Sequence, residues 1–411
     1  MEVIGKSKIL LPKEGINYEK WAVIACDQFT SQPEYWEKLA AYVGDAPSTL
    51  NLIFPEVYLK GDITERVNKI NSAMQQYIDD GIFTEIDGFV LTERTVEGGK
   101  KRLGLVLSVD LETFDYRRVR AAIRSTEDTI LERLPVRMEI RKNAPIELPH
   151  ILLLVDDPDK KIIEPLYENR DKLKKLYDFD LNMEGGHIKG YEVDNTDEII
   201  EKFNSLLDSR EQIRKYGVDA GIMLAVGDGN HSMATAKEHW NIVKQNLSEE
   251  ERANHPARFA LVEVLNVYDD GLMFEPIHRV ISAGGKEFVE GLKKNLTGKS
   301  KLRLVTTEGD ITVDCPEKSG ETILAVQTLI EKYLAEGKIK VDYIHGENYL
   351  RELVRTPDEV GVIMPRFAKS ELISYVMNVG NLPKKAFSIG TAENKKYYIE
   401  AKRIRNESES L

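Results

Sequence analysis

Residues 227–232, Gly-Asp-Gly-Asn-His-Ser, place an acid, an amide, an imidazole and a hydroxyl next to one another. Gly227 and Gly229 permit left-handed backbone angles and a close approach of the main chain to a ligand. Asp228 carries a carboxylate that can accept a proton from a hydroxyl group or bind a divalent cation. The stretch therefore suits a phosphate-binding turn. It also suits an ordinary tight turn, because Asp, Asn, Gly and Ser are common in turns and helix caps.

The flanking residues predict where this turn lies. Residues 222–226 are apolar and predict a buried strand, and residues 232–247 have apolar side chains at helical spacing. The turn then joins a strand to the N-terminus of a helix, where backbone N–H groups lack partners and the helix dipole is positive. Such a position favours phosphate. The stretch is neither a GxxxxGKS/T phosphate loop nor a GxSxG nucleophile elbow.

The charge of Asp228 needs a counter-charge if a phosphate binds beside it. Two negative groups repel each other unless a positive group lies between them. A Mg²⁺ ion held by the carboxylate and by phosphate oxygens would remove the conflict. The sequence thus predicts Asp228 as a ligand of Mg²⁺. The other interpretation is that Asp228 accepts the proton of a substrate hydroxyl.

Further candidate residues lie at the ends of other predicted strands. An acid at the end of a buried strand is a common feature of sites at a sheet edge, and capping of the strand end is the alternative. The histidines and the arginine also suit structural turns or surface ion pairs, and the lysine suits simple solvation. The candidates are Asp27, His278, Arg279, His345 and Lys385.

The elements that must position these residues are strands and helices in mixed order. Helices are predicted at residues 33–43, 63–81 and 162–178, and strands at 89–95 and 103–111 pair across a Gly-Gly turn. Hairpin signals and strand–helix alternation both occur, which predicts an α+β fold, with mixed α/β sheets and flanking helices. We expect three regions: 1–150, 151–255 with the turn, and 256–411, or one composite unit.

Composition excludes several classes of protein. The chain has 411 residues and a formal net charge of −12, which disfavours nucleic acid and anionic lipid as partners. Its two cysteines form neither a disulfide framework nor a CxxC metal motif. No apolar run is long enough to cross a bilayer, and the first residues do not resemble a signal peptide. A cytoplasmic protein is expected, while the sequence leaves the oligomeric state open.

Several motifs in conserved order resemble those of one family. Residues 227–232 are similar to the Ala-Asp-Gly-His-His-Arg turn of the uncharacterised prokaryotic proteins known as domain of unknown function 1015. That turn is shared in outline with the free-serine kinases and, more distantly, with ParB partition proteins and sulfiredoxins, which use it to hold nucleotide phosphates. Further similar segments are 21–37, 269–280, 342–346 and 378–391. The resemblance implies a ParB/sulfiredoxin-like strand–turn–helix nucleotide site, with ATP or ADP and Mg²⁺ as cofactors.

The chain departs from the family at the turn itself. Asn230, His231 and Ser232 stand where the family has His-His-Arg, so the arginine that would grip a phosphate is missing. Arg279, Lys385 or Arg124 could supply the positive charge from elsewhere in the chain.

Three functions remain open on this basis. The first is a nucleotide-binding phosphotransferase, kinase-like, that acts on a small hydroxylated metabolite or amino acid. The second is a non-catalytic protein that senses a nucleotide or metabolite, which the missing arginine favours. The third is a ParB-like nucleic-acid-associated protein, against which the net charge speaks. In the first function Asp228, His231, His278 and Arg279 are catalytic; Gly227, Gly229, Asn230, Ser232 and Lys385 bind the nucleotide; and Asp27 and His345 contact the substrate.

Overall fold

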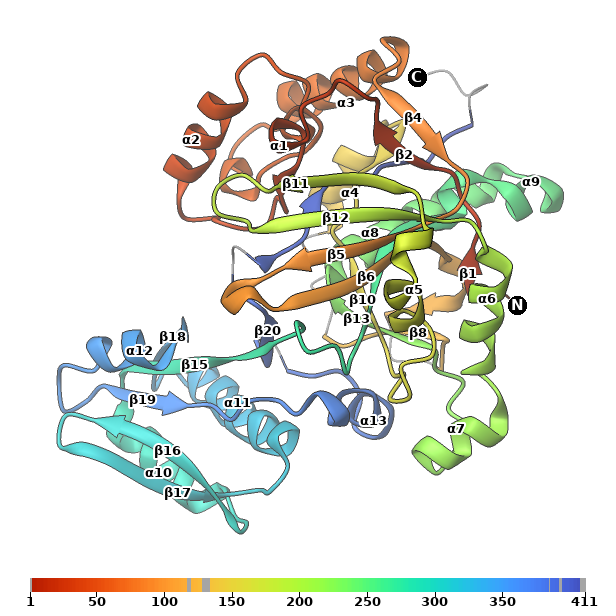
Figure 1. The fold of residues 1–411 in the computed structure, drawn as a ribbon. Coiled ribbons are helices and arrows are strands. Elements are labelled where there is room, and N and C mark those ends of the chain that lie inside the picture. Colours follow the sequence, from red (N-terminus) through yellow and green to blue (C-terminus); the bar gives the residue numbers. More distant parts are fainter. Residues whose placement is uncertain (1, 117–119, 128–133, 384, 392–393, 407–411) are drawn as a thin grey trace. The chain divides into compact units, whose positions relative to one another are not determined.

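The computed structural model describes residues 2–116, 120–127, 134–383, 385–391 and 394–406 (Figure 1). The chain forms two compact units. The first comprises Met1–Leu272 together with Ala392–Leu411, and the second comprises Met273–Thr391. The second unit is thus an insertion in the sequence of the first, whose last residues follow it along the chain. Both boundaries expected from the sequence, near 150 and 255, fall inside the first unit.

A large mixed sheet forms the centre of the first unit. Its strand order is β11-β12-β5-β6-β14-β10-β13-β8-β7, and β1 pairs with β6. β10 pairs in parallel with β14 and antiparallel with β13, which confirms the predicted mixed sheet. The strands are β1 (Ile4–Gly5), β5 (Phe89–Thr95), β6 (Lys101–Asp110), β7 (Phe114–Asp115), β8 (Ile123–Ser125), β10 (Leu152–Val155), β11 (Lys175–Asp180), β12 (His187–Val193), β13 (Leu224–Asp228) and β14 (Phe259–Asn266).

Both faces of this sheet are buried, because successive side chains of a strand point to opposite faces. Leu105 and Leu107 of β6 pack with Trp240 of α8 in one apolar cluster. Val106, between them, packs with Trp21 of α1 in a second cluster. The helices of this unit are α1 (Tyr18–Trp21), α2 (Pro33–Val43), α3 (Thr64–Asp79), α4 (Leu134–Lys142), α5 (Glu164–Glu168), α6 (Thr196–Ser205), α7 (Ser209–Tyr216), α8 (Asn230–Val243) and α9 (Glu249–Asn254).

The residues that follow the second unit along the chain complete the first unit. They form two short strands, each of which pairs antiparallel with a strand from an earlier part of the chain. The segment therefore contacts two parts of the chain that are far apart in the sequence, near residue 24 and near residue 147. The short strand pairs are β2 (Ile9–Pro12) with β4 (Phe83–Ile86), β3 (Val23–Ile24) with β21 (Tyr397–Tyr398), and β9 (Ile146–Glu147) with β22 (Lys402–Arg403).

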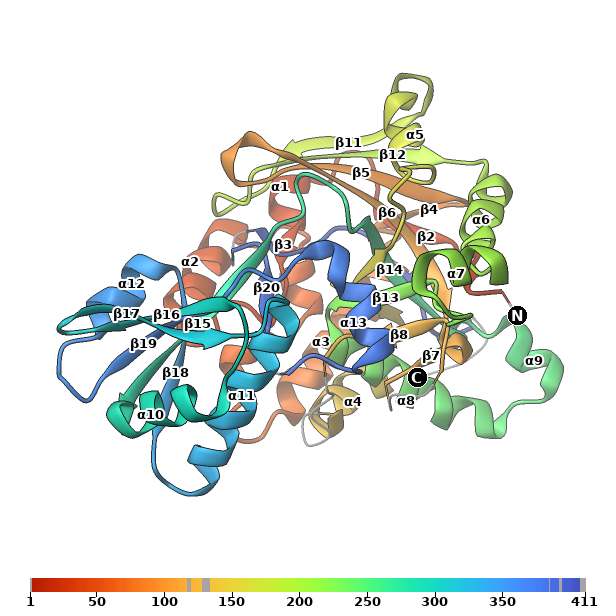
Figure 2. The same ribbon diagram turned by 90° about the horizontal axis from the view of Figure 1, so that it is seen from below.

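The second unit contains a smaller antiparallel sheet of order β17-β16-β19-β15-β18, with β20 paired to β15. Helix α11 lies against this sheet, since Gln327 of α11 bonds to Arg279 of β15 (Figure 2). Its elements are β15 (Phe274–Ala283), α10 (Gly285–Asn295), β16 (Ser300–Thr306), β17 (Gly309–Cys315), α11 (Ser319–Ala335), β18 (Lys340–His345), α12 (Glu347–Leu353), β19 (Val360–Ile363), α13 (Leu372–Asn378) and β20 (Phe387–Ile389).

Most predicted elements agree with the structure, and one is wrong in half of its length. α2 has the predicted bounds of 33–43, and β5 those of 89–95. The helix predicted over 162–178 ends at Glu168, and Lys175–Asp180 is the strand β11. The last four residues of this strand, Tyr-Asp-Phe-Asp, alternate apolar and polar side chains, so their period is two rather than 3.6. No helix within the described ranges combines the length and hydrophobicity that a bilayer span requires.

Candidate functional site

The predicted strand–turn–helix is present in the first unit. β13 ends at Asp228, and α8 begins at Asn230 with Gly229 as its N-cap. Gly229 has φ +80°, and a Cβ atom there would lie 3.0 Å from the Cα of Ile151. Only glycine meets both conditions without strain. As the N-cap residue, Gly229 has no side chain that could accept a hydrogen bond at the start of α8, where the helix dipole is positive.

Asp228 has the counter-charge that the sequence argument required, and it is a lysine. Lys395 Nζ lies 2.7 Å from Asp228 Oδ2, and the Lys395 side chain is only 12% exposed. The other carboxylate oxygen of Asp228 accepts a hydrogen bond from Gly229 N at 2.9 Å. The ammonium group therefore lies where the carboxylate would otherwise repel a phosphate.

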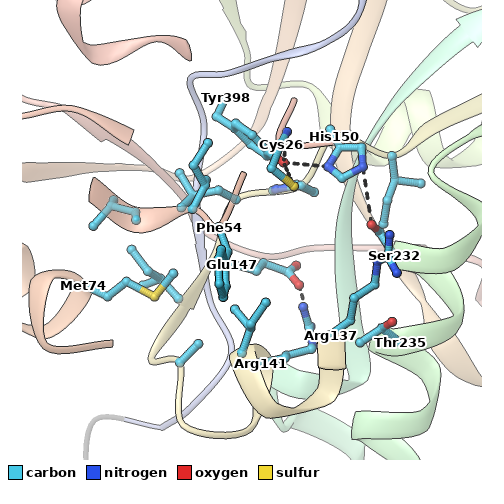
Figure 3. A pocket seen from close by; sticks show the side chains of 18 residues that line it. Cys26, Phe54, Met74, Arg137, Arg141, Glu147, His150, Ser232, Thr235 and Tyr398 are labelled. Carbon is cyan, nitrogen blue, oxygen red and sulfur yellow. Dashed lines mark hydrogen bonds and ion pairs between the residues drawn. The ribbon is translucent and has the colours of Figure 1, made fainter. Parts of the chain in front are cut away.

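A buried histidine lies beside the turn, brought there by the sheet register. β10 runs antiparallel to β13 with Leu152 opposite Asp228, so His150 precedes β10 close to the end of β13. His150 Nε2 lies 3.4 Å from Ser232 Oγ and 3.6 Å from Asp27 Oδ2. Its other ring nitrogen, Nδ1, is 2.8 Å from the hydroxyl of Tyr398 (Figure 3). Asp27 and Ser232, both predicted from the sequence, thus meet at one imidazole.

The charges of this group favour an imidazolium–carboxylate pair. Burial lowers the pKa of His150, but the negative charges of Asp27, Asp228 and Glu56 together outweigh burial, and the pKa is raised overall. Burial raises the pKa of Asp27, yet the interaction with His150, the hydrogen bond from Gln28 and the charge of Lys395 together outweigh burial and hold that pKa well below its usual range. At neutral pH Asp27 is therefore a carboxylate, held beside a histidine with an increased tendency to carry a proton.

Tyr398 orients the histidine. Its hydroxyl accepts from Cys26 N and donates to Cys26 Sγ, both at 3.2 Å. Because its own proton is directed to sulfur, the oxygen can accept a hydrogen bond from a protonated Nδ1 of His150. Burial raises the pKa of Cys26 to about 12, so this cysteine is a thiol and not a nucleophilic thiolate.

The Ser232, His150 and Asp27 side chains are not a hydrolase triad. In a triad the serine bonds to one ring nitrogen and the aspartate orients the other. Here both Ser232 and Asp27 face Nε2, and Tyr398 occupies Nδ1. A histidine paired in this way acts as a fixed cation rather than as a base for the serine.

A cavity of about 160 Å³ adjoins these residues (Figure 3). Ser232 and Thr235 of α8, together with His150 and Tyr398, form its polar end. Apolar side chains from other elements form much of the remaining wall, and two arginine–carboxylate pairs accompany them. This wall consists of Cys26, Leu52, Ile53, Phe54, Met74, Ile140, Ala144, Ile146, Leu148, Pro149 and Ile151, with Arg137, Arg141 and Glu147.

The surroundings of Asp228 bear on the predicted Mg²⁺ ion. One carboxylate oxygen pairs with the Lys395 ammonium and the other accepts a hydrogen bond from Gly229 N, so each oxygen already has one partner within the protein. Within the described part of the chain, no group of three or more His, Cys, Asp or Glu side chains is arranged to hold a metal. Asp228 is therefore paired with Lys395, and its role as a metal ligand stays a prediction.

The remaining residues of the turn occupy the start of the helix. Asn230 and His231 form its first turn together with Ser232, and Asn230 is 8% exposed. Gly227 is a residue of β13. The roles of these residues in phosphate binding stay predictions.

Four predicted site residues belong to the second unit. Arg279 is fully buried, and it donates to Gln327 Oε1 at 3.2 Å and to the carbonyl of Lys385 at 3.0 Å. His278 is 5% exposed and accepts a hydrogen bond from Met364 N. The register places His278 and Arg279 beside the strand that ends in His345, which is exposed, as is Lys385. Their catalytic and binding roles stay predictions.

Three residues of the site were missed by the sequence argument: His150, Lys395 and Tyr398. His150 follows Pro149 at the start of an apolar run, a polar residue at a strand end like Asp27, and this signal was available. Lys395 and Tyr398 lie far along the chain in a segment that reads only as a strand. Pairing with β3 places them, and no local pattern indicates it.

Comparison with curated proteins gives no match. Among solved structures, a mutant of free serine kinase in complex with AMP has a TM-score of 0.39 at 14% identity, covering 73% of this chain and 92% of that chain. A conserved hypothetical protein from Pyrococcus furiosus has a TM-score of 0.34 at 10% identity, covering 73% and 95%. C-terminally truncated SbnI from Staphylococcus aureus has a TM-score of 0.38 at 10% identity, covering 73% and 87%. These similarities carry no conclusion about activity.

A family model gives the stronger result. The model described as "Protein of unknown function (DUF1015)" matches residues 10–403, nearly the whole chain. The resemblance of the ordered motifs pointed to the same family, and the described fold holds the turn that carries it. The chain belongs to the DUF1015 family.

Proposed function

We propose that the first unit binds a nucleotide through its phosphates and transfers a phosphoryl group to the hydroxyl of a small molecule. One observation carries this proposal. His150, a buried imidazole with a raised pKa, lies against Ser232 in the first turn of α8, a helix whose N-cap is a glycine. A helix start with an adjacent cation favours phosphate oxygens. The family's missing arginine is thereby replaced by charge from other elements.

The proposed phosphate site combines hydrogen-bond donors with positive charges. The start of α8 and the Ser232 hydroxyl donate hydrogen bonds to phosphate oxygens. His150 and Lys395 supply positive charge, and Asp228 holds the Lys395 ammonium at 2.7 Å. Because Asp228 is neutralised by this pair, its carboxylate does not oppose the phosphate. Phosphoryl transfer depends mainly on such positioning and charge.

Asp27 is the proton acceptor in the transfer step. The acceptor oxygen forms a bond to the terminal phosphorus of a nucleoside di- or triphosphate, and the bond from that phosphorus to the bridging oxygen breaks. The nucleotide leaves with one phosphate fewer, and the hydroxyl proton passes to Asp27. Asp27 is placed for this role because it lies on the same nitrogen of His150 as Ser232 does, and phosphoryl transfer depends more on positioning the hydroxyl than on the strength of the base. No step requires a metal ligand from the protein.

Isothermal titration with AMP, ADP and ATP, each with and without Mg²⁺, tests the binding part. We expect the wild type to bind at least one nucleotide, and His150→Gln to weaken that binding by roughly 10- to 100-fold, since a charged hydrogen-bond donor is lost. His187→Gln is the matched control, because His187 lies on β12 with two aspartate partners. Folded wild-type protein that binds none of the three nucleotides would contradict the proposal.

A second function, nucleotide or metabolite sensing without turnover, is favoured by one observation. Both carboxylates at the turn are paired with cations, Asp27 with His150 and Asp228 with Lys395. A sensor predicts that Asp27→Asn leaves nucleotide binding intact and that the wild type transfers no phosphate to any hydroxyl compound. A phosphotransferase predicts transfer by the wild type and its loss in Asp27→Asn at unchanged nucleotide affinity. Phosphate transfer followed by ³¹P NMR separates the two.

A further inference from the structure

The cavity beside His150 has two chemically distinct ends. At one end lie Ser232, His150 and Tyr398, the groups already placed around the phosphate (Figure 3). At the other end lie the side chains of Phe54 and Met74. Phe54 lies between the 3₁₀ helix η1 (Thr49–Leu52) and α3, and Met74 belongs to α3. These two apolar side chains are about 4% exposed each. A ligand that fills the cavity therefore presents its polar group to His150 and its apolar body to α3.

The charges of the cavity wall do not favour a second anion. Arg137 is paired with Glu56, and Arg141 is paired with Glu147 at 2.5 Å. Each guanidinium thus already has a carboxylate, and neither offers an uncompensated charge to a phosphate or carboxylate ligand. Arg141 Nε is buried and has no hydrogen-bond partner among the described residues. It provides one donor, which a neutral acceptor atom of a ligand can satisfy.

The size of the cavity limits what can bind. An apolar protein cavity of about 150 Å³ is large enough for benzene. The cavity here, of about 160 Å³, suits one ring or a branched chain with a short polar group. A purine together with its ribose is much larger than benzene, so the cavity suits a single ring better than a whole nucleoside.

We propose that this cavity holds the phosphoryl acceptor, a neutral alcohol with an aromatic or branched apolar body, whose hydroxyl lies at the end formed by Ser232 and His150. The inference rests on the proposed function and adds to it the class of the acceptor. The apolar body packs against Phe54, Met74 and Ala144, and an acceptor atom on it bonds to Arg141 Nε. The hydroxyl then lies next to the carboxylate of Asp27, which receives its proton as described above.

Two substitutions of opposite effect on cavity size test the proposal, and both leave the polar end unchanged. Ala144→Leu adds side-chain volume and reduces the cavity, whereas Met74→Ala removes side-chain volume and enlarges it. The probes are 2-phenylethanol, 2-(2-naphthyl)ethanol and adenosine, with binding measured by titration calorimetry. Ile242→Ala, an exposed position of α8 that is 55% exposed, is the control for a change elsewhere on the same helix.

We expect a reciprocal change in selectivity. Wild type and Ile242→Ala bind 2-phenylethanol, Ala144→Leu weakens that binding by about 10-fold or more, and Met74→Ala shifts preference toward the naphthyl alcohol by about 10-fold. ADP affinity stays within about twofold in all variants, because the phosphate site is untouched. If one variant fails to fold, as seen by circular dichroism, the other still gives one arm of the comparison.

Three results would overturn the acceptor assignment. One is adenosine that displaces 2-phenylethanol, together with ADP binding that falls in Ala144→Leu, since the cavity would then hold the nucleobase. Another is unchanged alcohol selectivity in both size variants while ADP still binds. That result would contradict the acceptor assignment but not the proposed nucleotide binding. The last is wild-type protein that binds no nucleotide, which removes the proposed function on which the assignment rests.

Discussion

Ser232 stands where the family's turn has an arginine, and this difference moves the positive charge of the site to other parts of the chain. His150, before β10, and Lys395, in the last segment of the chain, supply cations instead. The two cations differ chemically, because a histidine gains and loses its proton near neutral pH and a lysine does not. The site therefore has a pH dependence that an arginine in the turn would not give.

The His150–Asp27 pair predicts the direction of that dependence. His150 has a folded-state pKa raised above 6.5, so its contribution to stability is fully present below 6.5 and is lost as pH rises through the raised pKa. Asp27 has a folded-state pKa below 3.8, so its contribution is present above 3.8 and is lost as pH falls through the lowered pKa. The charges acting on His150 are those of Asp27, Asp228 and Glu56, and all three raise its pKa.

We thus expect nucleotide affinity and melting temperature to decline as pH rises past the pKa of His150. The variant His150→Gln should lack this part of the decline, because glutamine does not titrate. Calorimetric titrations and thermal unfolding at half-unit steps from pH 5.5 to 9 measure both quantities. An identical pH profile for wild type and variant would show that His150 is not the titrating group.

Gly229 allows a test of the turn geometry itself. Gly229→Ala meets two penalties, a left-handed φ of +80° and a Cβ that lies 3.0 Å from the backbone of Ile151. Gly217→Ala, at the C-cap of α7, meets only the first, since its φ is +76° and no atom lies within 4 Å. The left-handed angle alone costs roughly 1–2 kcal/mol.

Gly229→Ala should therefore lower the free energy of unfolding more than Gly217→Ala does, by about 1–3 kcal/mol for the added overpacking. Denaturant unfolding followed by circular dichroism gives both values. Equal losses in the two variants would mean that the chain relaxes freely around Ile151, and that the turn is not held as tightly as its geometry implies.

At the scale of elements, the segment after the second unit is what assembles the site. β21 pairs with β3, and β22 pairs with β9. Tyr398 belongs to β21, and Lys395 lies just before that strand. Lys395 reaches the turn after β13, and Tyr398 reaches His150 before β10. One short stretch thereby links two elements that are antiparallel neighbours in the sheet.

A double-mutant cycle on Asp228 and Lys395 tests this link. Lys395→Met leaves the partly buried carboxylate of Asp228 without its cation, and Asp228→Asn leaves the ammonium without its anion. The double variant removes both charges. Its loss of unfolding free energy should therefore be smaller than the sum of the two single-variant losses, by roughly 0.5–3 kcal/mol. Unfolding free energies of the four proteins measure the coupling. Strict additivity would show that the pair is not formed in solution.

A comparison of the predicted elements with the observed ones shows where the local sequence pattern is enough to predict the bounds of an element. α2 and β5 have long, clean periodicities, and their bounds follow from sequence alone. Over 162–178 the helical part ends after Glu168, and the period then changes from 3.6 to two. The pairing of β11 with β12 supplies the backbone partners that favour the strand over the helix.

At the scale of the whole molecule, the chain closes the first unit with a buried network of charges. Lys396 Nζ lies 3.2 Å from Glu263 Oε2 on the central strand β14 and 3.2 Å from Glu400 Oε2. All three residues are at most 6% exposed. Tyr177 of β11 donates a hydrogen bond to Glu400 at 2.5 Å, and Thr92 of β5 donates one to Glu263 at 2.6 Å. The last residues of the first unit are thus fixed to the middle of its sheet.

Lys396→Met should destabilise the first unit strongly, because two buried carboxylates lose their shared cation, at a cost of about 3–5 kcal/mol. Lys6→Met is the control, as Lys6 forms an exposed surface pair with Asp197, and such pairs contribute little to stability. Chemical denaturation of both variants provides the measurement. Similar small losses in the two proteins would mean that the network is open to water.

The sequence by itself determined the strand–turn–helix around residues 227–232, the mixed α/β class and the family, because these follow from short-range periodicity and from motifs contiguous in the chain. Only the tertiary structure decided which charges face the turn. His150 arrives through an antiparallel register and Lys395 through a segment that lies 167 residues further along the chain than Asp228. The energy of an ion pair depends on the distance between the two charges in space and becomes small when they move apart. Separation along the chain does not encode that distance.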